Sequence, residues 1–172
     1  MWSTANKLMI LLTAIIVVVQ MTWWYPQLPN PMPSHFDNQG QINGTMDKTL
    51  FCGMMGGLNA LFLIGFPLLS VLMKQLPNSM VNIPNKEFWL ATERRDQSLQ
   101  RVGTFLSFLG WSSGWFFMGL FQLTALVAVN ARQTITPEFF WLLGIFMAVI
   151  WGTVLLLIFK FRLPRSPKRN HI

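Results

Sequence analysis

Charged residues are scarce in this sequence, and they are missing from its longest hydrophobic runs. Of 172 residues, 11% are charged and 52% are hydrophobic, whereas a soluble globular domain carries about 25% charged residues. So few charges cannot cover a surface that faces water, and the high apolar content excludes intrinsic disorder. A chain of this length forms about one domain. We therefore expect a single membrane domain over residues 1–172.

Cysteine and histidine are also nearly absent. The single cysteine, Cys52, excludes a disulfide scaffold and a multi-cysteine metal site. It lies in an apolar stretch, where a thiol is desolvated and unreactive. His35 with Asp37 and Asp47 shows no recognised metal-ligand spacing. We therefore expect no catalytic residue, no bound metal and no cofactor.

The sequence does contain four long apolar blocks without Asp, Glu, Lys, Arg or His, which cover residues 8–25, 50–73, 102–129 and 139–159. A helix needs about 20 apolar residues to cross a membrane, and every block is near or beyond that length. The blocks lack the alternation of barrel strands, so helices are the remaining way to satisfy the backbone in lipid. The predicted fold class is therefore all-α, with four transmembrane helices.

The basic residues are distributed unevenly between the connecting segments. The loop over residues 26–48 and the segment 130–138 hold only Lys48 and Arg132. The remaining Lys and Arg are Lys7, Lys74, Lys86, Arg94, Arg95, Arg101, Lys160, Arg162, Arg165, Lys168 and Arg169. Because cytoplasmic segments carry the excess of Lys and Arg, we predict that both termini are inside. The loop 26–48 is then outer, the loop 74–101 is inner, and residues 160–172 form a basic inner tail.

Small and amide residues within the blocks predict how the helices pack. Glycine and alanine let helices in lipid approach closely. Such residues recur at every fourth position as Gly53 and Gly57, as Gly110 and Gly114, and as Gly144, Ala148 and Gly152. We expect the second, third and fourth helices to form the tight core, the first to be more exposed to lipid, and copies of the chain to self-associate. Asn59 and Gln122 are predicted to form hydrogen bonds between helices.

The outer loop is rich in residues with special backbone conformations. Its prolines stiffen the chain where it leaves the membrane. Gly40 and the Asn43–Gly44 pair are turn signals, and the pair is typical of a hairpin. We expect Phe36 to be buried and Lys48 to pair with Asp37 or Asp47. The loop is thus predicted to be an ordered cap, and its structural or partner-binding candidates are His35, Phe36, Asp37, Gly40, Asn43, Gly44 and Lys48.

In the inner loop an apolar stretch adjoins a charged cluster. Phe88, Trp89 and Leu90 precede Glu93, Arg94 and Arg95, a pattern typical of a segment that lies in the membrane interface. Thr92 is predicted to cap a helix that continues into the third block. The candidate partner-binding residues of this loop are Trp89, Glu93, Arg94 and Arg95.

The motifs of the two loops resemble a bacterial membrane domain of unknown function. The outer motif reads His35-Phe36-Asp37-x-x-Gly40-x-x-Asn43-Gly44-x-Met46-x-Lys48, and the inner one runs from Asn82 through Trp89-Leu90-Ala91 to Arg95. The family tends to have Asp where Asn43 stands and Pro where Thr92 stands. The resemblance covers roughly residues 8–110. It implies a multi-pass protein of the bacterial cytoplasmic membrane. The same domain begins proteins similar to the immunity protein of the sporulation-delay toxin system.

Two classes of function remain open. The first is a non-enzymatic membrane protein that binds a partner, such as another membrane protein, a second copy or a peptide, and that acts in regulation or immunity. The alternative is a small-molecule carrier or membrane enzyme, which needs a polar cavity among the helices lined by Asn59, Gln122 and His35. The bilayer itself is a partner in both cases. Binding to nucleic acid is not expected, because no basic face of a soluble domain is available.

Overall fold

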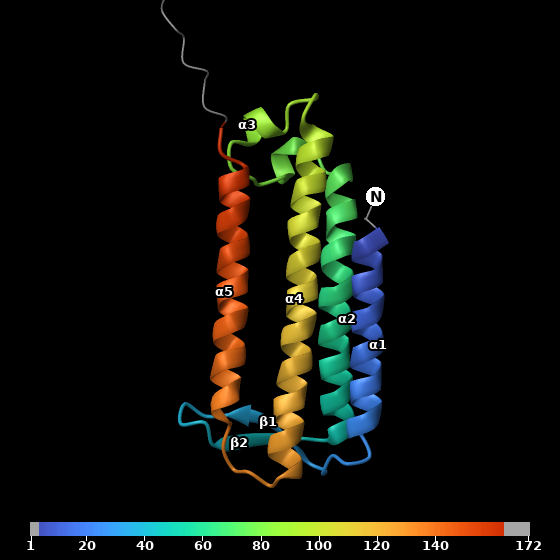
Figure 1. The fold of residues 1–172 in the computed structure, drawn as a ribbon, viewed down its shortest axis with the longest axis vertical. Helices are drawn as coiled ribbons and strands as arrows, with labels where there is room; N and C mark the ends of the chain where they lie inside the picture. The colour runs from blue at the N-terminus through green and yellow to red at the C-terminus, as the bar shows by residue number, and fades with distance from the viewer. Residues whose placement is uncertain (1–3, 164–172) are drawn as a thin grey trace, which may run out of the picture.

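The computed structural model describes residues 4–163, and its four long helices lie side by side (Figure 1). They are α1 (Thr4–Trp24), α2 (Lys48–Leu72), α4 (Arg95–Val129) and α5 (Pro137–Lys160). A hairpin of β1 (Met32–Phe36) and β2 (Ile42–Met46) crosses one end of the bundle. The start of α1 and the end of α5 lie at the other end (Figure 1). We call these the hairpin end and the terminal end.

All four long helices are long and apolar enough to cross a membrane, as the sequence predicts. Each extends at one or both ends beyond the apolar block that predicted it. α2 begins at Lys48 because the carboxylate of Asp47 accepts hydrogen bonds from the backbone N–H groups of Thr49 and Leu50. α4 begins at Arg95 without a side-chain cap, so Thr92 is not the N-cap that the sequence indicates.

The closest contact in the bundle is between α2 and α4. A Cβ atom added to Gly110 would lie 2.5 Å from the carbonyl oxygen of Phe62, and one added to Gly114 would lie 2.8 Å from the side chain of Leu63. Both glycines are buried. They let the two backbones approach to a distance that no larger residue would allow.

The other small residues differ from this expectation. A Cβ atom at Gly53, Gly57, Gly144 or Gly152 would meet no atom within 4 Å, and Ala148 is exposed. In α2 the intervening Gly56 faces another helix instead, with the sulfur of Met21 3.5 Å from its added Cβ. Of the four spans, α5 has the smallest share of buried residues in its apolar stretch, at 6% against 11% for α1. The tight core is therefore α2 with α4, and α5 is more exposed than α1, because its small residues do not face α4.

The two intramembrane amides also differ from each other. The side-chain oxygen of Gln122 accepts hydrogen bonds from Gln20 and from the indole N–H of Trp24, both at 2.9 Å, and so joins α4 to α1. Asn59 instead donates within α2, to the carbonyl of Met55 at 3.3 Å. Its buried oxygen has no hydrogen-bond partner among the residues described. The expected bond between helices at Asn59 is thus not formed.

The outer loop folds as an antiparallel hairpin whose turn lies at Asp37–Gln41. The carboxylate of Asp37 accepts hydrogen bonds from the backbone N–H groups of Gln39 at 2.8 Å and Gln41 at 2.9 Å. Gly40 completes the turn with a φ of +79°, a conformation that glycine adopts at no steric cost. Asn43 and Gly44 lie within β2, opposite an irregularity near His35, and are not the predicted turn, because Asp37 and Gly40 set it earlier.

Met32 and Leu28 anchor the hairpin to the bundle. Met32 is fully buried and Leu28 is 4% exposed, in a cluster with Phe51 of α2 and Phe121 of α4. Phe36 is half-buried, so it is not the buried anchor that the sequence suggests.

The link from the outer loop into α2 uses other contacts than the predicted ion pair. The ammonium group of Lys48 donates to the carbonyl of Leu28 at 3.4 Å and lies 4.9 Å from the centre of the Tyr25 ring. Asp47 accepts from the side chain of Asn30 at 3.0 Å. Lys48 thus stabilises the turn after α1 rather than a carboxylate.

At the terminal end, the inner loop folds into short helices that pack against the ends of α4 and α5. These are η1 (Met73–Gln75), η2 (Asn78–Met80) and α3 (Lys86–Trp89). The indole N–H of Trp89 and the amide of Asn85 both donate to the carbonyl of Phe161 at 2.8 Å. Phe161 and Leu90 are buried in one apolar cluster there. The segment therefore packs on the helix ends, and of the basic tail residues Arg165, Lys168 and Arg169 lie outside the described range.

Candidate functional site

A groove of about 400 Å³ lies between the hairpin and the helix ends beneath it. Four elements supply its walls. The strand β1 contributes His35 and Phe36, and the first turns of α5 contribute Phe139 and Phe140. The groove thus joins residues that are about a hundred positions apart in the sequence.

Helical spacing explains the floor of the groove. Phe51 and Met55 are one turn apart on α2, and Leu120 and Thr124 are one turn apart on α4. Residues four apart lie on the same face of a helix, so both helices present two side chains to the groove. The floor is apolar except for the hydroxyl of Thr124, which donates to the carbonyl of Leu120 at 2.9 Å.

The rim of the groove is polar, and its polar groups hold the hairpin in shape. Nδ1 of His35 is hydrogen-bonded to the side-chain oxygen of Asn43 across the two strands. Asp37 is engaged in the turn. In residues 4–163 no group of three His, Cys, Asp or Glu side chains is placed to hold a metal ion. The groove therefore has hydrogen-bonding groups at its rim and an apolar surface inside.

The connection between α4 and α5 closes one side of the groove. Ile42 donates its backbone N–H to the carbonyl of Gln133 at 3.0 Å, and Ile135 donates to the carbonyl of Gly40 at 2.8 Å. The sequence reasoning missed this contact. The β-branched run Thr134, Ile135, Thr136 is the signal that could have indicated it, because such residues favour extended backbone.

Asp47 ties the hairpin to α2 electrostatically. Hydrogen bonds from the backbone N–H of Leu50, from the side chain of Asn30 and from the backbone N–H of Thr49 lower the pKa of its carboxyl. These donors stabilise the ionised form. The carboxylate also lies at the positive end of the α2 dipole, so this junction holds its charge well below neutral pH.

The candidate residues of the inner loop lie at the terminal end, away from the groove (Figure 1). Arg94 donates to the carbonyl of Phe88 at 2.8 Å, and its guanidinium lies 4.0 Å from the centre of that ring. Arg95 donates to the carbonyls of Lys74 at 3.2 Å and Leu76 at 2.7 Å. Both arginines donate to backbone oxygens of the inner loop, while Glu93 is exposed. The structure thus separates the two sets of candidates.

Comparison with known proteins identifies a family model that matches part of the chain. No curated protein and no solved structure matches the chain. The matched segment, residues 8–58, contains most of α1, the whole hairpin and α2 as far as residue 58. The family model that matches it is described as a domain of unknown function, DUF1648.

Proposed function

We propose that this chain is a non-enzymatic membrane protein that binds an apolar segment of another membrane polypeptide in the groove at the hairpin end. The observation that supports this proposal is the ordered hairpin over an apolar groove lined by Phe36, Phe51, Phe139 and Phe140. Rigid aromatic side chains supply large contact areas at low entropic cost and dominate binding energy at many interfaces.

The surface beside the groove also fits an apolar partner. Phe140 is 62% exposed and Trp141 is 74% exposed in the first two turns of α5. Trp141 lies where aromatic residues commonly meet the membrane interface. A partner that enters the groove at this level would cover both rings, and it would be a membrane-inserted segment rather than a polar solute.

We further propose that the chain resides in a bacterial cytoplasmic membrane and has a regulatory or immunity-like role. This finer part follows from the loop motifs and from their likeness to immunity-type proteins. The partner would then be a peptide or a membrane protein that approaches from the hairpin side.

The carrier or enzyme alternative finds less support. His35 lies at the exposed rim, Gln122 is engaged with α1, and Asn59 adjoins an apolar cavity between α1 and α2. These three residues do not line one cavity. A cavity that contains polar and basic side chains does exist between α1, α2 and α4. Most of its lining surface is apolar, and its walls come from the terminal end alone, which favours binding there over passage across the membrane.

Site-specific photocrosslinking tests the proposal. A photoreactive phenylalanine analogue at position 36 or 140, introduced in cells of the source organism, should give one discrete polypeptide adduct. The same analogue at Leu61, which is 61% exposed on α2, should give lipid adducts only.

A variant with a filled groove provides the control. Leu120→Trp places a larger ring in the floor and should remove the polypeptide adduct while the protein remains folded. Adducts to lipid alone at both groove positions would contradict the proposal. An adduct at twice the mass of the chain from position 36 would also contradict it, because it would assign the groove to a second copy.

A further inference from the structure

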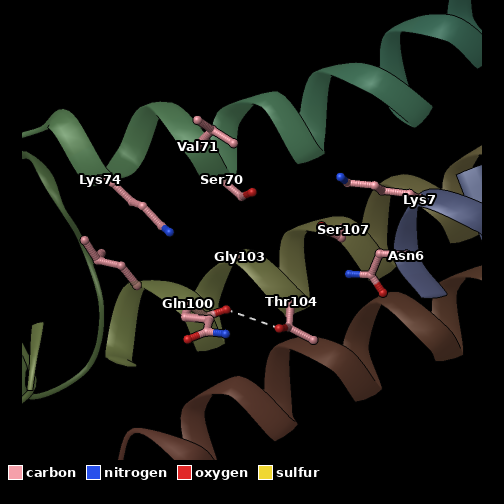
Figure 2. Close-up of a pocket in the computed structure, with 10 residues that line it drawn as sticks. Asn6, Lys7, Ser70, Val71, Lys74, Gln100, Gly103, Thr104 and Ser107 are labelled. Atoms are coloured by element: carbon pink, nitrogen blue, oxygen red, sulfur yellow. Dashed lines mark hydrogen bonds between the residues drawn. The ribbon is translucent and has the colours of Figure 1, made fainter. Parts of the chain in front are cut away.

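A second cavity, of about 560 Å³, lies at the terminal end between α1, α2 and α4 (Figure 2). Its floor is formed where Ser70 of α2 approaches Gly103 of α4, with 3.1 Å between the Cβ of Ser70 and a Cβ added to the glycine. Ser70 and Ser107 are buried in this floor. The side chains of Gln100 and Thr104 stand at the exposed rim. The cavity is therefore lined by hydrogen-bonding groups from floor to rim.

Two lysines give the cavity its charge. Figure 2 shows the ammonium groups of Lys7 and Lys74 directed into the space between α2 and α4 from opposite sides. Lys7 lies in the first two turns of α1, and Lys74 follows the end of α2. No acidic side chain is among the described residues that line the cavity. Two positive charges thus share one cavity without a carboxylate among its described lining residues.

Other groups that line the cavity are apolar or already hydrogen-bonded within the chain. The apolar side chains of Val71 and Leu99 also line the cavity. The carbonyl of Gln100 already accepts from the hydroxyl of Thr104 at 3.1 Å, and the hydroxyl of Ser70 donates to the carbonyl of Pro67 at 2.6 Å. The donors left to face an anion are chiefly the two ammonium groups, each with three N–H bonds, and the amide of Gln100.

We propose that this cavity binds a phosphate-bearing anion, held by Lys7 and Lys74 at its mouth. Lysine binds phosphate as a point charge, and juxtamembrane basic residues attract anionic headgroups. The cavity lies where the apolar stretches of α1 and α2 end, which is the level of lipid headgroups. Two sources share this chemistry: the headgroup of an anionic phospholipid and a soluble phosphate compound.

Native mass spectrometry of the full chain tests the site and distinguishes the sources. In one arm the protein is released from nanodiscs that contain phosphatidylglycerol and phosphatidylcholine. In the other it is held in neutral phosphatidylcholine nanodiscs and titrated with inorganic phosphate. We expect retention of the anion in at least one arm. The Lys7→Gln, Lys74→Gln double variant should lower the affinity roughly thirtyfold, or about fivefold for each lysine.

Lys160→Gln is the matched control. Lys160 is exposed in the last turn of α5 at the same end and does not line the cavity, so this variant should retain the anion as the unmodified chain does. If the double variant fails to fold, by circular dichroism, the two single variants replace it. Absence of a retained anion in both arms, or an equal loss in Lys160→Gln, would overturn the proposal. The site is at the opposite end from the groove, so its failure leaves the proposed partner binding untouched.

Discussion

Individual residues at the hairpin end determine how the cap is built, and Asp47 is the most informative. Its carboxylate caps α2 and accepts from Asn30, and these hydrogen bonds lower its pKa. A group whose pKa is lower in the folded chain stabilises the fold above its unfolded pKa, which is about 4 for aspartic acid. That contribution is lost as the pH falls through the lowered, folded-state pKa.

The first prediction follows from the direction of this pKa shift. Asp47→Ala should lower the thermal midpoint in detergent at pH 7, because two backbone N–H groups lose their acceptor. Asp47→Asn, which also caps helices but does not titrate, should retain much of the stability at pH 7. It should lose less than the unmodified chain when the pH is taken below about 4. Equal acid sensitivity of the two proteins would contradict this role.

The second prediction concerns Gly40. Its φ of +79° and the 2.8 Å between an added Cβ and the Cγ2 atom of Ile135 both oppose a side chain. Gly40→Ala should therefore cost about 1–3 kcal/mol of stability, the usual range for a strained left-handed residue. Thermal unfolding in detergent measures this. His35→Gln is the comparison, because glutamine keeps a hydrogen-bonding group near Asn43, and we expect a small change there.

At the scale of helices, the contact between α2 and α4 gives the third prediction. A Cβ on Gly110 meets a backbone oxygen, which cannot move aside as a flexible side chain can. Gly110→Ala should destabilise the bundle by about 1–3 kcal/mol, the usual cost of overpacking. Gly53→Ala, where the added Cβ meets nothing within 4 Å, should be neutral or stabilising by up to about 1 kcal/mol. Similar losses at both positions, measured by unfolding in detergent, would contradict the packing described.

The helices could be predicted from the sequence because length and apolarity alone identify a transmembrane span. Their rotation could not be predicted. Gln122 and Asn59 occupy similar apolar surroundings in the sequence, yet only Gln122 forms a hydrogen bond to another helix, where Gln20 and Trp24 supply donors. The spacing of glycines has the same limit as a predictor. A stripe of small residues shows that another helix can approach closely, but it does not show which helix does so.

The hairpin and the groove show why the candidate site was predicted only in part. The ordered outer cap follows from its prolines and turn residues. Its register depends on the carboxylate of Asp37 and on pairing with Gln133 and Ile135, far along the chain. The groove floor unites Phe51 with Leu120, and nothing local in either segment indicates the other. Such a site is a property of the packed bundle.

At the scale of the whole molecule, self-association stays a prediction, and we assign it to the exposed small residues of α5. Gly144 and Ala148 are exposed on α5, and small residues on a lipid-facing surface allow helices to pack closely. We expect a dimer or higher oligomer when mass is measured in nanodiscs. Gly144→Leu with Ala148→Leu should weaken it at least tenfold, and Leu61→Ala should not. A monomer under all mild conditions would contradict the expectation.

The orientation of the whole molecule is the last prediction. The start of α1 and the end of α5 lie at the same end of the bundle (Figure 1). The side of the membrane on which that end lies therefore determines the side of every connecting loop. The terminal end holds Lys74, Arg95 and Arg162 among its cations, whereas the hairpin end holds only Lys48 and Arg132 among the described residues. Cytoplasmic segments carry the excess of Lys and Arg, so we expect the terminal end on the cytoplasmic side. Asn38 and Gln97 are exposed at opposite ends. In a Cys52→Ala background, an impermeant thiol reagent should label Asn38→Cys in intact cells and Gln97→Cys only after permeabilisation. The reverse pattern would place the hairpin and its groove inside the cell, and with them the partner that we propose.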